Sequence, residues 1–152
     1  TAAYQGMKMI DANTKAEDDD ALISIDAGSF TAKDSATGNF QYEYKGQKSA
    51  SWFADNWMHT KDAANDALTV KLNCKTLMFV YKLSSSSSFG PADVYIDGEK
   101  KGTLNGYDSS GWNNGKVFVA MTNEEVAEHT IEIKMADESA AKNFTLMAIG
   151  FN

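Results

Sequence analysis

The chain has 152 residues, of which 43% are hydrophobic and 11% aromatic, so it can bury the core of one domain and is unlike a disordered tail. Its formal net charge of −7 argues against nucleic acids and anionic membrane surfaces, because Lys and Arg supply most of the attraction to both. No apolar stretch is long enough to span a membrane, and we expect neither a nucleic-acid nor a membrane partner.

The first twenty residues differ from the rest. They lack an initiator Met and the basic and apolar regions of a signal peptide, so we expect the chain to be excised from a longer or processed one. The segment ends in the acidic run 17–20, which is typical of a solvated surface. We expect residues 1–20 to be a connector or an edge strand, and residues 21–152 to form the β-domain.

Strand patterns fill the chain from residue 22 onward. Alternation of apolar and polar residues predicts antiparallel strands with one buried face at 68–73, 92–97 and 130–135. Runs that are apolar on both faces predict central strands at 77–81 and 144–149. Further strands are expected at 22–25 and 116–121.

Turn signals separate these strands, at residues 84–91, 97–98, 105–106 and 113–115. Helical signals are confined to one turn at 122–125, where Thr122 and Glu125 have capping-box spacing, and a short segment near 61–66. Roughly seven to ten short strands with such turns predict an all-β fold, a jelly-roll β-sandwich with antiparallel sheets.

Side chains suited to catalysis are scarce. Cys74, the single cysteine, lies in an apolar strand and is predicted to be a buried small hydrophobe rather than a reactive thiol. His129 directly precedes the strand 130–135, and a structural role is expected for it. A structural hydrogen-bonding role is also favoured for His59, although His59 could contact a ligand. No nucleophile elbow, zinc-protease motif or phosphate loop occurs, so the chain is not expected to be an enzyme.

The tryptophans carry the strongest functional signal. They fall in two predicted loops, 51–59 and 107–114, which mix large rings with Asp, Asn and Ser. A sugar needs this mixture, because its C–H face stacks on an aromatic plane while its hydroxyls bond to amides and carboxylates. The candidate carbohydrate-binding residues are therefore Trp52, Asp55, Asn56, Trp57, Tyr107, Trp112, Asn113 and Asn114. The alternative is that these rings fill the ends of the sandwich.

A structural calcium ion is a further candidate, because sandwich domains that bind sugars often hold calcium with Asp, Asn and backbone oxygens. Its possible ligands are Asp18, Asp20, Asp26 and Asp137, although no EF-hand-type loop defines their geometry. No other cofactor is expected.

Several segments together resemble a known accessory domain. They are residues 28–30, 56–59, 89–100, 104–107, 112–114, 129–133 and 144–151. They look like the galactose-binding-like β-sandwich, a carbohydrate-binding module, that is attached to SGNH/GDSL carbohydrate esterases of gut and rumen Firmicutes. The resemblance spans about residues 22–151.

The resemblance implies a secreted bacterial module that binds a plant cell-wall polysaccharide. It implies a β-1,4-linked ligand, such as β-mannan, glucomannan or another hemicellulose or β-glucan, and an attached catalytic domain that is held close to it. The serine motif of the esterases is absent from this chain, so no catalysis by the chain itself is implied. The alternative function is a structural β-sandwich that docks on a neighbouring esterase domain without glycan affinity of its own, with the tryptophans as interface anchors.

Overall fold

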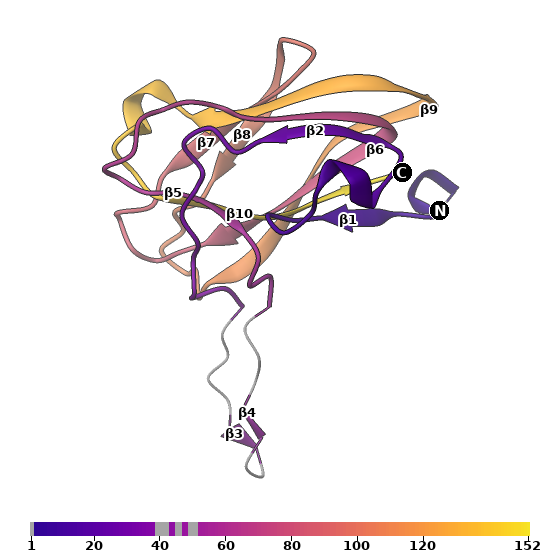
Figure 1. The fold of residues 1–152 in the computed structure, drawn as a ribbon. Coiled ribbons are helices and arrows are strands. Elements are labelled where there is room, and N and C mark those ends of the chain that lie inside the picture. Colours follow the sequence, from indigo (N-terminus) through magenta and orange to yellow (C-terminus); the bar gives the residue numbers. More distant parts are fainter. Residues whose placement is uncertain (1, 39–42, 45–46, 49–51) are drawn as a thin grey trace.

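The structure, a computed structural model, describes residues 2–38, 43–44, 47–48 and 52–152, and most of its regular elements are β-strands (Figure 1). They are β1 (Lys8–Ile10), β2 (Leu22–Asp26), β3 (Glu43–Tyr44), β4 (Gln47–Lys48), β5 (Trp57–His59), β6 (Leu68–Leu83), β7 (Pro91–Ile96), β8 (Glu99–Asn105), β9 (Asn114–Met135) and β10 (Phe144–Phe151). Single turns of 3-10 helix form η1 (Ala2–Tyr4), η2 (Ala16–Asp18) and η3 (Asp137–Ser139). The prediction of an all-β fold is confirmed.

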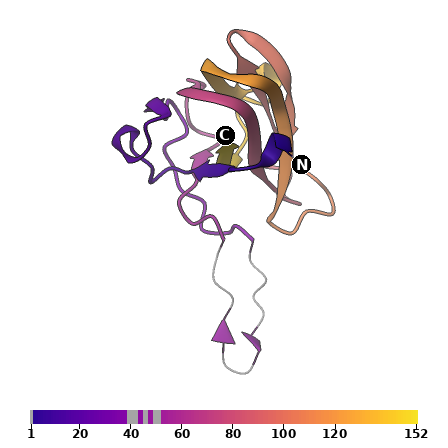
Figure 2. The same ribbon diagram turned by 90° about the vertical axis from the view of Figure 1, so that its right-hand side faces the viewer.

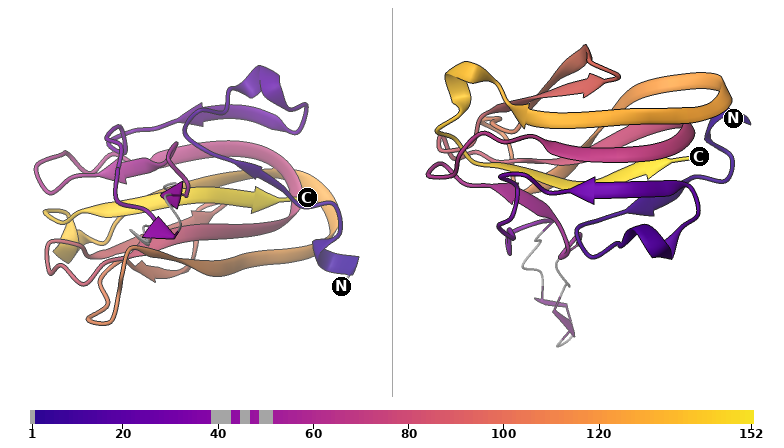
Figure 3. Two further views of the ribbon diagram at one scale, coloured as in Figure 1. Left: turned by 90° about the horizontal axis from the view of Figure 1, so that it is seen from below. Right: turned by 45° about the horizontal axis from the view of Figure 1, so that its top comes forward.

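The two longest strands, β6 and β9, run through both layers of a sandwich in which the paired strands are antiparallel. The first layer holds β2, residues 68–74 of β6, residues 127–135 of β9, β7 and β8. In the second layer, β10 lies between the end of β6 and the short strands β1 and β5, and residues 114–122 of β9 follow β6. The register shifts between Cys74 and Thr76, and Figures 2 and 3 show both long strands curving from one layer to the other.

The core fills the space between the layers, because alternate residues of each strand point to the same face. The buried inward residues of β6 are Leu68, Val70, Leu72 and Cys74 in the first layer and Leu77, Phe79 and Tyr81 in the second. Across the second layer, β10 adds Phe144, Leu146, Ile149 and Phe151 to the same core. The shift in register therefore keeps one apolar face of β6 pointing inward on both sides of the bend.

The second layer is also covered on its outer face. Val80, Met147 and Ala148 pack together on that face, and Phe53 lies against them. All eight residues of β10 are buried as a result, which confirms the prediction of a central strand with two buried faces at 144–149. The segment that carries Phe53 thus forms part of the fold and is held close to the sheet.

A buried ion pair fastens the loop that follows β2 to this second layer. Lys82 Nζ of β6 lies 2.9 Å from Asp34 Oδ2, and both side chains are buried. Thr145 of β10 donates to the same carboxylate oxygen at 2.7 Å, and the Lys82 ammonium lies 4.7 Å from the centroid of the Phe89 ring. Each charge therefore has polar or aromatic partners in place of water.

The helical turn predicted at 122–125 is wrong, because this segment belongs to β9. Thr122 pairs with Thr76 and Ala127 pairs with Cys74, so the exposed residues 123–126 lie where the two strands bend. Strand pairing thus overrides the local capping signal.

The short helix predicted near 61–66 is also wrong, because the polar groups there bond elsewhere. The Ala64 carbonyl contacts the His59 ring, and the Asn65 side chain exchanges two hydrogen bonds with the Met135 backbone. The backbone N–H of Asp66 donates to Ser29 Oγ at 2.9 Å. These contacts hold the segment as a turn that joins β5 to β6.

The N-terminal segment contributes to the sheet as well. Lys8–Ile10 pairs with residues 149–151 of β10, and Ile10 is buried in the core. No helix in the described part of the chain is long and apolar enough to cross a membrane.

The burial of Cys74 yields a first prediction. Its side chain is fully buried, and burial raises the pKa of the thiol to about 12, so almost no thiolate exists near neutral pH. We expect a thiol reagent such as Ellman's reagent at about pH 8 to leave the native protein unlabelled and to label it in concentrated urea. Rapid stoichiometric labelling without urea would contradict this expectation.

The buried ion pair yields a second prediction. Asp34→Ala leaves the Lys82 ammonium buried without its anion, and we expect the free energy of unfolding to fall by roughly 3–5 kcal/mol. The control is Lys33→Ala, which breaks the exposed pair with Asp55 and should change it by about 0–1 kcal/mol. Urea titrations followed by circular dichroism measure both values.

A double variant tests whether the unpaired, buried Lys82 ammonium causes the loss of stability. Asp34→Ala combined with Lys82→Met removes both charges, and it should be more stable than Asp34→Ala alone. The explanation is wrong if the double variant is the less stable of the two.

Candidate functional site

Two of the three tryptophans reach solvent, and the third does not. Trp52 is 65% exposed and Trp112 is 47% exposed, whereas Trp57 is 3% exposed. The two exposed rings come from the segment after β4 and from the loop between β8 and β9. They are the large rings that a flat ligand can reach.

Backbone contacts bring these two segments together. The Gly38 N–H donates to the Asn113 carbonyl at 2.6 Å, and the Trp52 N–H donates to the Thr37 carbonyl at 3.2 Å. The Thr37 hydroxyl in turn donates to the Trp52 carbonyl. Residues 37–38 therefore form a bridge between the backbone of Trp52 and the residue that follows Trp112.

Gly38 suits this bridge for a steric reason. Its φ of +66° lies in the left-handed region, and a Cβ there would lie 3.2 Å from the Cβ of Trp52. A side chain at this position would both strain the backbone and push Trp52 away.

The loop between β8 and β9 is held against the end of β6. The Asn113 N–H donates to the Leu83 carbonyl at 2.9 Å, and the Asp108 N–H donates to the Ser84 carbonyl at 2.9 Å. A Cβ on Gly111 would lie 2.9 Å from the Leu83 carbonyl group, so only glycine allows this close approach. The loop that carries Trp112 is thus fixed to a strand of the core.

Polar side chains of this loop bond to its own backbone. Asn105 Oδ1 accepts from the Tyr107 N–H at 3.1 Å, Asp108 Oδ1 from the Ser110 N–H at 2.8 Å, and Asn114 Oδ1 from the Trp112 N–H at 3.1 Å. These contacts to nearby backbone N–H groups are typical of turns. Asn113 adopts a φ of +70°, a left-handed conformation that asparagine tolerates. Asn114 therefore helps to shape the loop, and Tyr107 is 40% exposed on it.

Two exposed valines form an apolar strip on the outer face of the second layer. Val117 pairs with Val80 and Val119 with Met78, so both valines lie on the face that Phe53 partly covers. They are 54% and 42% exposed. These valines are not among the residues predicted from the sequence, because the alternation at 116–121 does not tell which face of the strand is covered.

Asn56 was predicted to contact the ligand, but its buried side chain serves the fold. Its Oδ1 accepts from the Asp34 N–H at 2.8 Å, and its Nδ2 donates to the carbonyls of Asp34 and Phe53, both at 2.8 Å. The amide therefore has no free donor. The Asp55 carboxylate is partly exposed and lies 3.1 Å from the Lys33 ammonium.

Trp57 was predicted to lie in a loop, and this is wrong. It begins β5 and pairs with Leu146 of β10, and its ring belongs to the core cluster. The face of its indole is therefore not available for stacking on a sugar. The Trp57 side chain points into the core because the residue pairs with β10, a strand that lies far away in the sequence.

Both histidines have structural partners, as predicted. His59 is buried, with Nδ1 2.8 Å from the Lys142 carbonyl oxygen and Nε2 2.7 Å from that of Ala64. His129 Nδ1 lies 2.7 Å from Asp97 Oδ2. The Asp97 carboxylate accepts a hydrogen bond from the Thr130 N–H and makes a second one with His129. Both lower the pKa of this carboxyl below its usual value, and the bond from Thr130 has the larger effect.

The candidate calcium ligands do not converge. Within the described ranges, no three side chains of His, Cys, Asp or Glu come together in a way that could hold a metal ion. Asp18 Oδ2 accepts from the Lys15 N–H at 2.8 Å, and Asp26 Oδ1 accepts from the Gly28 N–H at 3.0 Å. Both carboxylates thus bond to the backbone close to them in sequence.

No protein-family model and no curated protein matches the chain. Among solved structures it is similar to a two-domain esterase active on acetylated mannans, co-crystallised with mannopentaose, with a TM-score of 0.66 and 15% identity. The match covers 97% of this chain and 36% of the esterase, so the chain spans about a third of that protein.

Two binding modules match over most of their own length. One is a family 35 carbohydrate-binding module from an environmental isolate, with a TM-score of 0.56, 12% identity and coverage of 93% of this chain and 90% of the module. The other is a family 35 module from Cellvibrio japonicus, with a TM-score of 0.57, 8% identity and coverage of 95% and 91%. At such identities the likeness shows the fold: the chain is a jelly-roll β-sandwich of the kind found in carbohydrate-binding modules.

Proposed function

We propose that the chain is a non-catalytic carbohydrate-binding module for a β-1,4-linked plant cell-wall polysaccharide, such as β-mannan, glucomannan or another hemicellulose. One observation carries the proposal: Trp52 and Trp112 are exposed on two segments that a backbone hydrogen bond from Gly38 to Asn113 holds together. Exposed indoles on a fixed backbone are suited to the apolar faces of pyranose rings.

The free energy expected from stacking on the exposed tryptophans fits weak to moderate binding of a polysaccharide. Covering about half of one indole removes roughly 75–125 Å² of surface from water, which at about 25 cal/mol/Å² is worth roughly 2–3 kcal/mol. Two rings and a few hydrogen bonds stabilise the complex, and part of this free energy is lost because the ligand loses freedom of motion. The net result would be a dissociation constant of roughly micromolar to millimolar.

The chemistry of the histidines supports a role without catalysis. A hydrolase of the serine or cysteine type needs a base beside its nucleophile. In the described residues, His59 contacts two carbonyl oxygens and His129 contacts a carboxylate, and neither contacts a hydroxyl or a thiol. Cys74 is buried in the core.

The comparisons support the ligand class and the setting. The modules that match over most of their own length are carbohydrate-binding modules, and the two-domain esterase is active on acetylated mannans. By analogy, this chain would be attached to a carbohydrate-active enzyme, an esterase in the simplest case, and would hold it close to hemicellulose. The corresponding location is outside a bacterial cell, where plant polysaccharide is found.

Substitution of the exposed rings tests the proposal. Trp52→Ala and Trp112→Ala should each weaken binding to glucomannan or galactomannan roughly ten- to a hundredfold, and the double variant should abolish it, because each ring supplies about 1.4–2.7 kcal/mol of stacking. Affinity gel electrophoresis and calorimetric titration measure the change.

Tyr4→Ala is the matched control, because Tyr4 is an exposed aromatic residue in η1, at the N-terminal end and away from the loop that carries Trp112 (Figure 1). It should bind like the unchanged protein. The proposal fails if no plant polysaccharide is bound, or if the tryptophan variants bind as well as the control.

The exposed valines favour a second candidate function. Val117 and Val119 extend an apolar strip on the outer face of a sheet, and such strips often contact another protein domain. A docking module would lack glycan affinity of its own but would bind the neighbouring esterase domain. Val117→Ser with Val119→Ser should then weaken that association, whereas the unchanged protein should bind no polysaccharide in affinity gel electrophoresis.

A further inference from the structure

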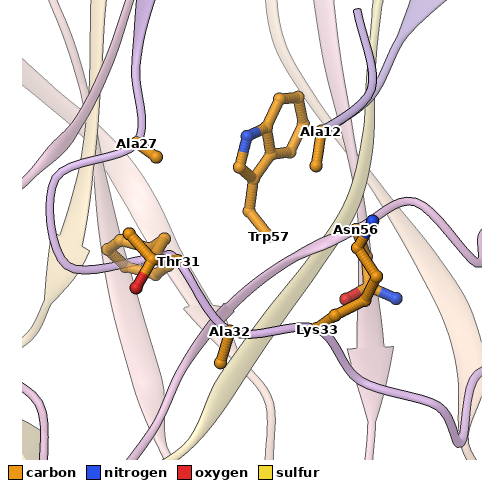
Figure 4. A pocket seen from close by; sticks show the side chains of 8 residues that line it. Ala12, Ala27, Thr31, Ala32, Lys33, Asn56 and Trp57 are labelled. Carbon is orange, nitrogen blue, oxygen red and sulfur yellow. The ribbon is translucent and has the colours of Figure 1, made fainter.

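A second polar feature lies apart from the exposed tryptophans. A pocket of about 290 Å³ opens between the segment 27–33, Ala12 and the start of β5 (Figure 4). Its lining includes neither Trp52 nor Trp112. It is therefore a different place on the molecule from the surface that the proposed function uses.

The walls of this pocket are held by backbone hydrogen bonds. Ala32 and Met58 exchange bonds of 3.1 and 2.9 Å, which attach the segment 27–33 to β5, and the Ala12 N–H donates to the Asp55 carbonyl at 2.9 Å. The Phe30 N–H closes a turn on the Ala27 carbonyl at 2.8 Å. The pocket is thus part of the folded chain and needs no rearrangement to form.

The indole N–H of Trp57 faces this pocket without a partner. The residue is 3% exposed, and no described residue supplies an acceptor for this N–H. Figure 4 shows the nitrogen-bearing edge of the ring turned toward Ala27 across the pocket. Trp57 Nε1 is not one of the buried polar atoms that lack a partner, so it reaches solvent through the pocket and is available to a ligand.

The other polar groups of the lining narrow the ligand chemistry. Lys33 and Thr31 contribute an ammonium and a hydroxyl, whereas the amide of Asn56 is already used within the fold. The Lys33 ammonium lies 3.1 Å from Asp55 Oδ1, so its charge is compensated. Hydrogen-bond donors without net charge favour a neutral ligand that is rich in acceptor oxygens. The methyl groups of three lining alanines favour a ligand that also presents C–H groups.

We infer that this pocket is a second carbohydrate subsite that takes one neutral pyranose, with a ring or hydroxyl oxygen accepting from Trp57 Nε1. The volume lies at the lower limit of ordinary ligand pockets, roughly 300 Å³, which suits a chain end or a branch sugar and not the middle of a chain. The inference rests on the proposed function for its ligand class and adds a site with a different mode of recognition.

The Trp57 indole signal reports directly on this site. In ¹⁵N-labelled protein it is assigned by its loss in Trp57→Phe, which keeps a ring in the core but removes the N–H. Titration to about 50 mM with the methyl glycosides of β-mannose, β-glucose and α-galactose should move this signal saturably, with a millimolar dissociation constant. The Trp52→Ala/Trp112→Ala variant should show the same shift.

Ala27→Leu tests the subsite by filling the pocket, because Ala27 is one of its lining residues. It should weaken the glycoside that binds best at least tenfold, as measured by the shift of the Trp57 signal, and leave polysaccharide binding at Trp52 and Trp112 unchanged. A Trp57 signal that stays still for all three glycosides, or that moves equally in Ala27→Leu, overturns the subsite. If polysaccharide binding persists in that case, the proposed function survives without it, and if both are lost, both proposals fail.

Discussion

The buried pair of Lys82 and Asp34 is the constraint on which the rest of the structure depends. Lys82 lies on the outer face of β6, two residues from Val80, and it is shielded from water by Phe89 and by the loop that brings Asp34. A buried ammonium requires a compensating charge. The chain after β2 must therefore cross this face of the second layer, and Asn56 binds the backbone of Asp34 from the returning segment. The position of Trp52 follows from that crossing.

The same constraint explains why one short segment has several roles. Between Trp52 and Trp57 the chain leaves the outer face of the sheet and enters its edge. Trp52 is exposed, Phe53 packs on Val80, and the side chain of Asn56 hydrogen-bonds to backbone groups. Phe53 adopts a φ of +57°, which marks the sharp change in direction that this path requires. Residues that are neighbours in sequence thus end on different surfaces of the molecule.

The strands could be predicted from the sequence because alternation is a local signal, and residues 68–73, 92–96 and 130–135 lie in strands as expected, while Asp97 lies in the turn that follows β7. The predictions that fail concern segments whose conformation depends on a strand far away in the sequence. Residues 122–125 carry a capping pattern, yet pairing with β6 makes them part of β9. Trp57 sits among polar residues like a loop tryptophan, yet it pairs with Leu146 of β10. A charged Lys82 within an otherwise apolar run is the one local signal that could have pointed to the buried pair.

The shape of the exposed surface also bears on selectivity. The loop polar groups of Asn105, Asp108 and Asn114 bond to their own backbone, so the rings of Trp52 and Trp112 provide most of what a ligand meets there. Stacking distinguishes poorly between pyranoses that share an apolar face, whereas a hydrogen bond left unmade in a buried pocket discriminates strongly. For the proposed function, an aromatic surface of this kind would recognise β-1,4-linked chains broadly. Discrimination between individual sugars has to come from a site with directed donors, and in the described part of the chain the pocket beside Trp57 is a place that offers them.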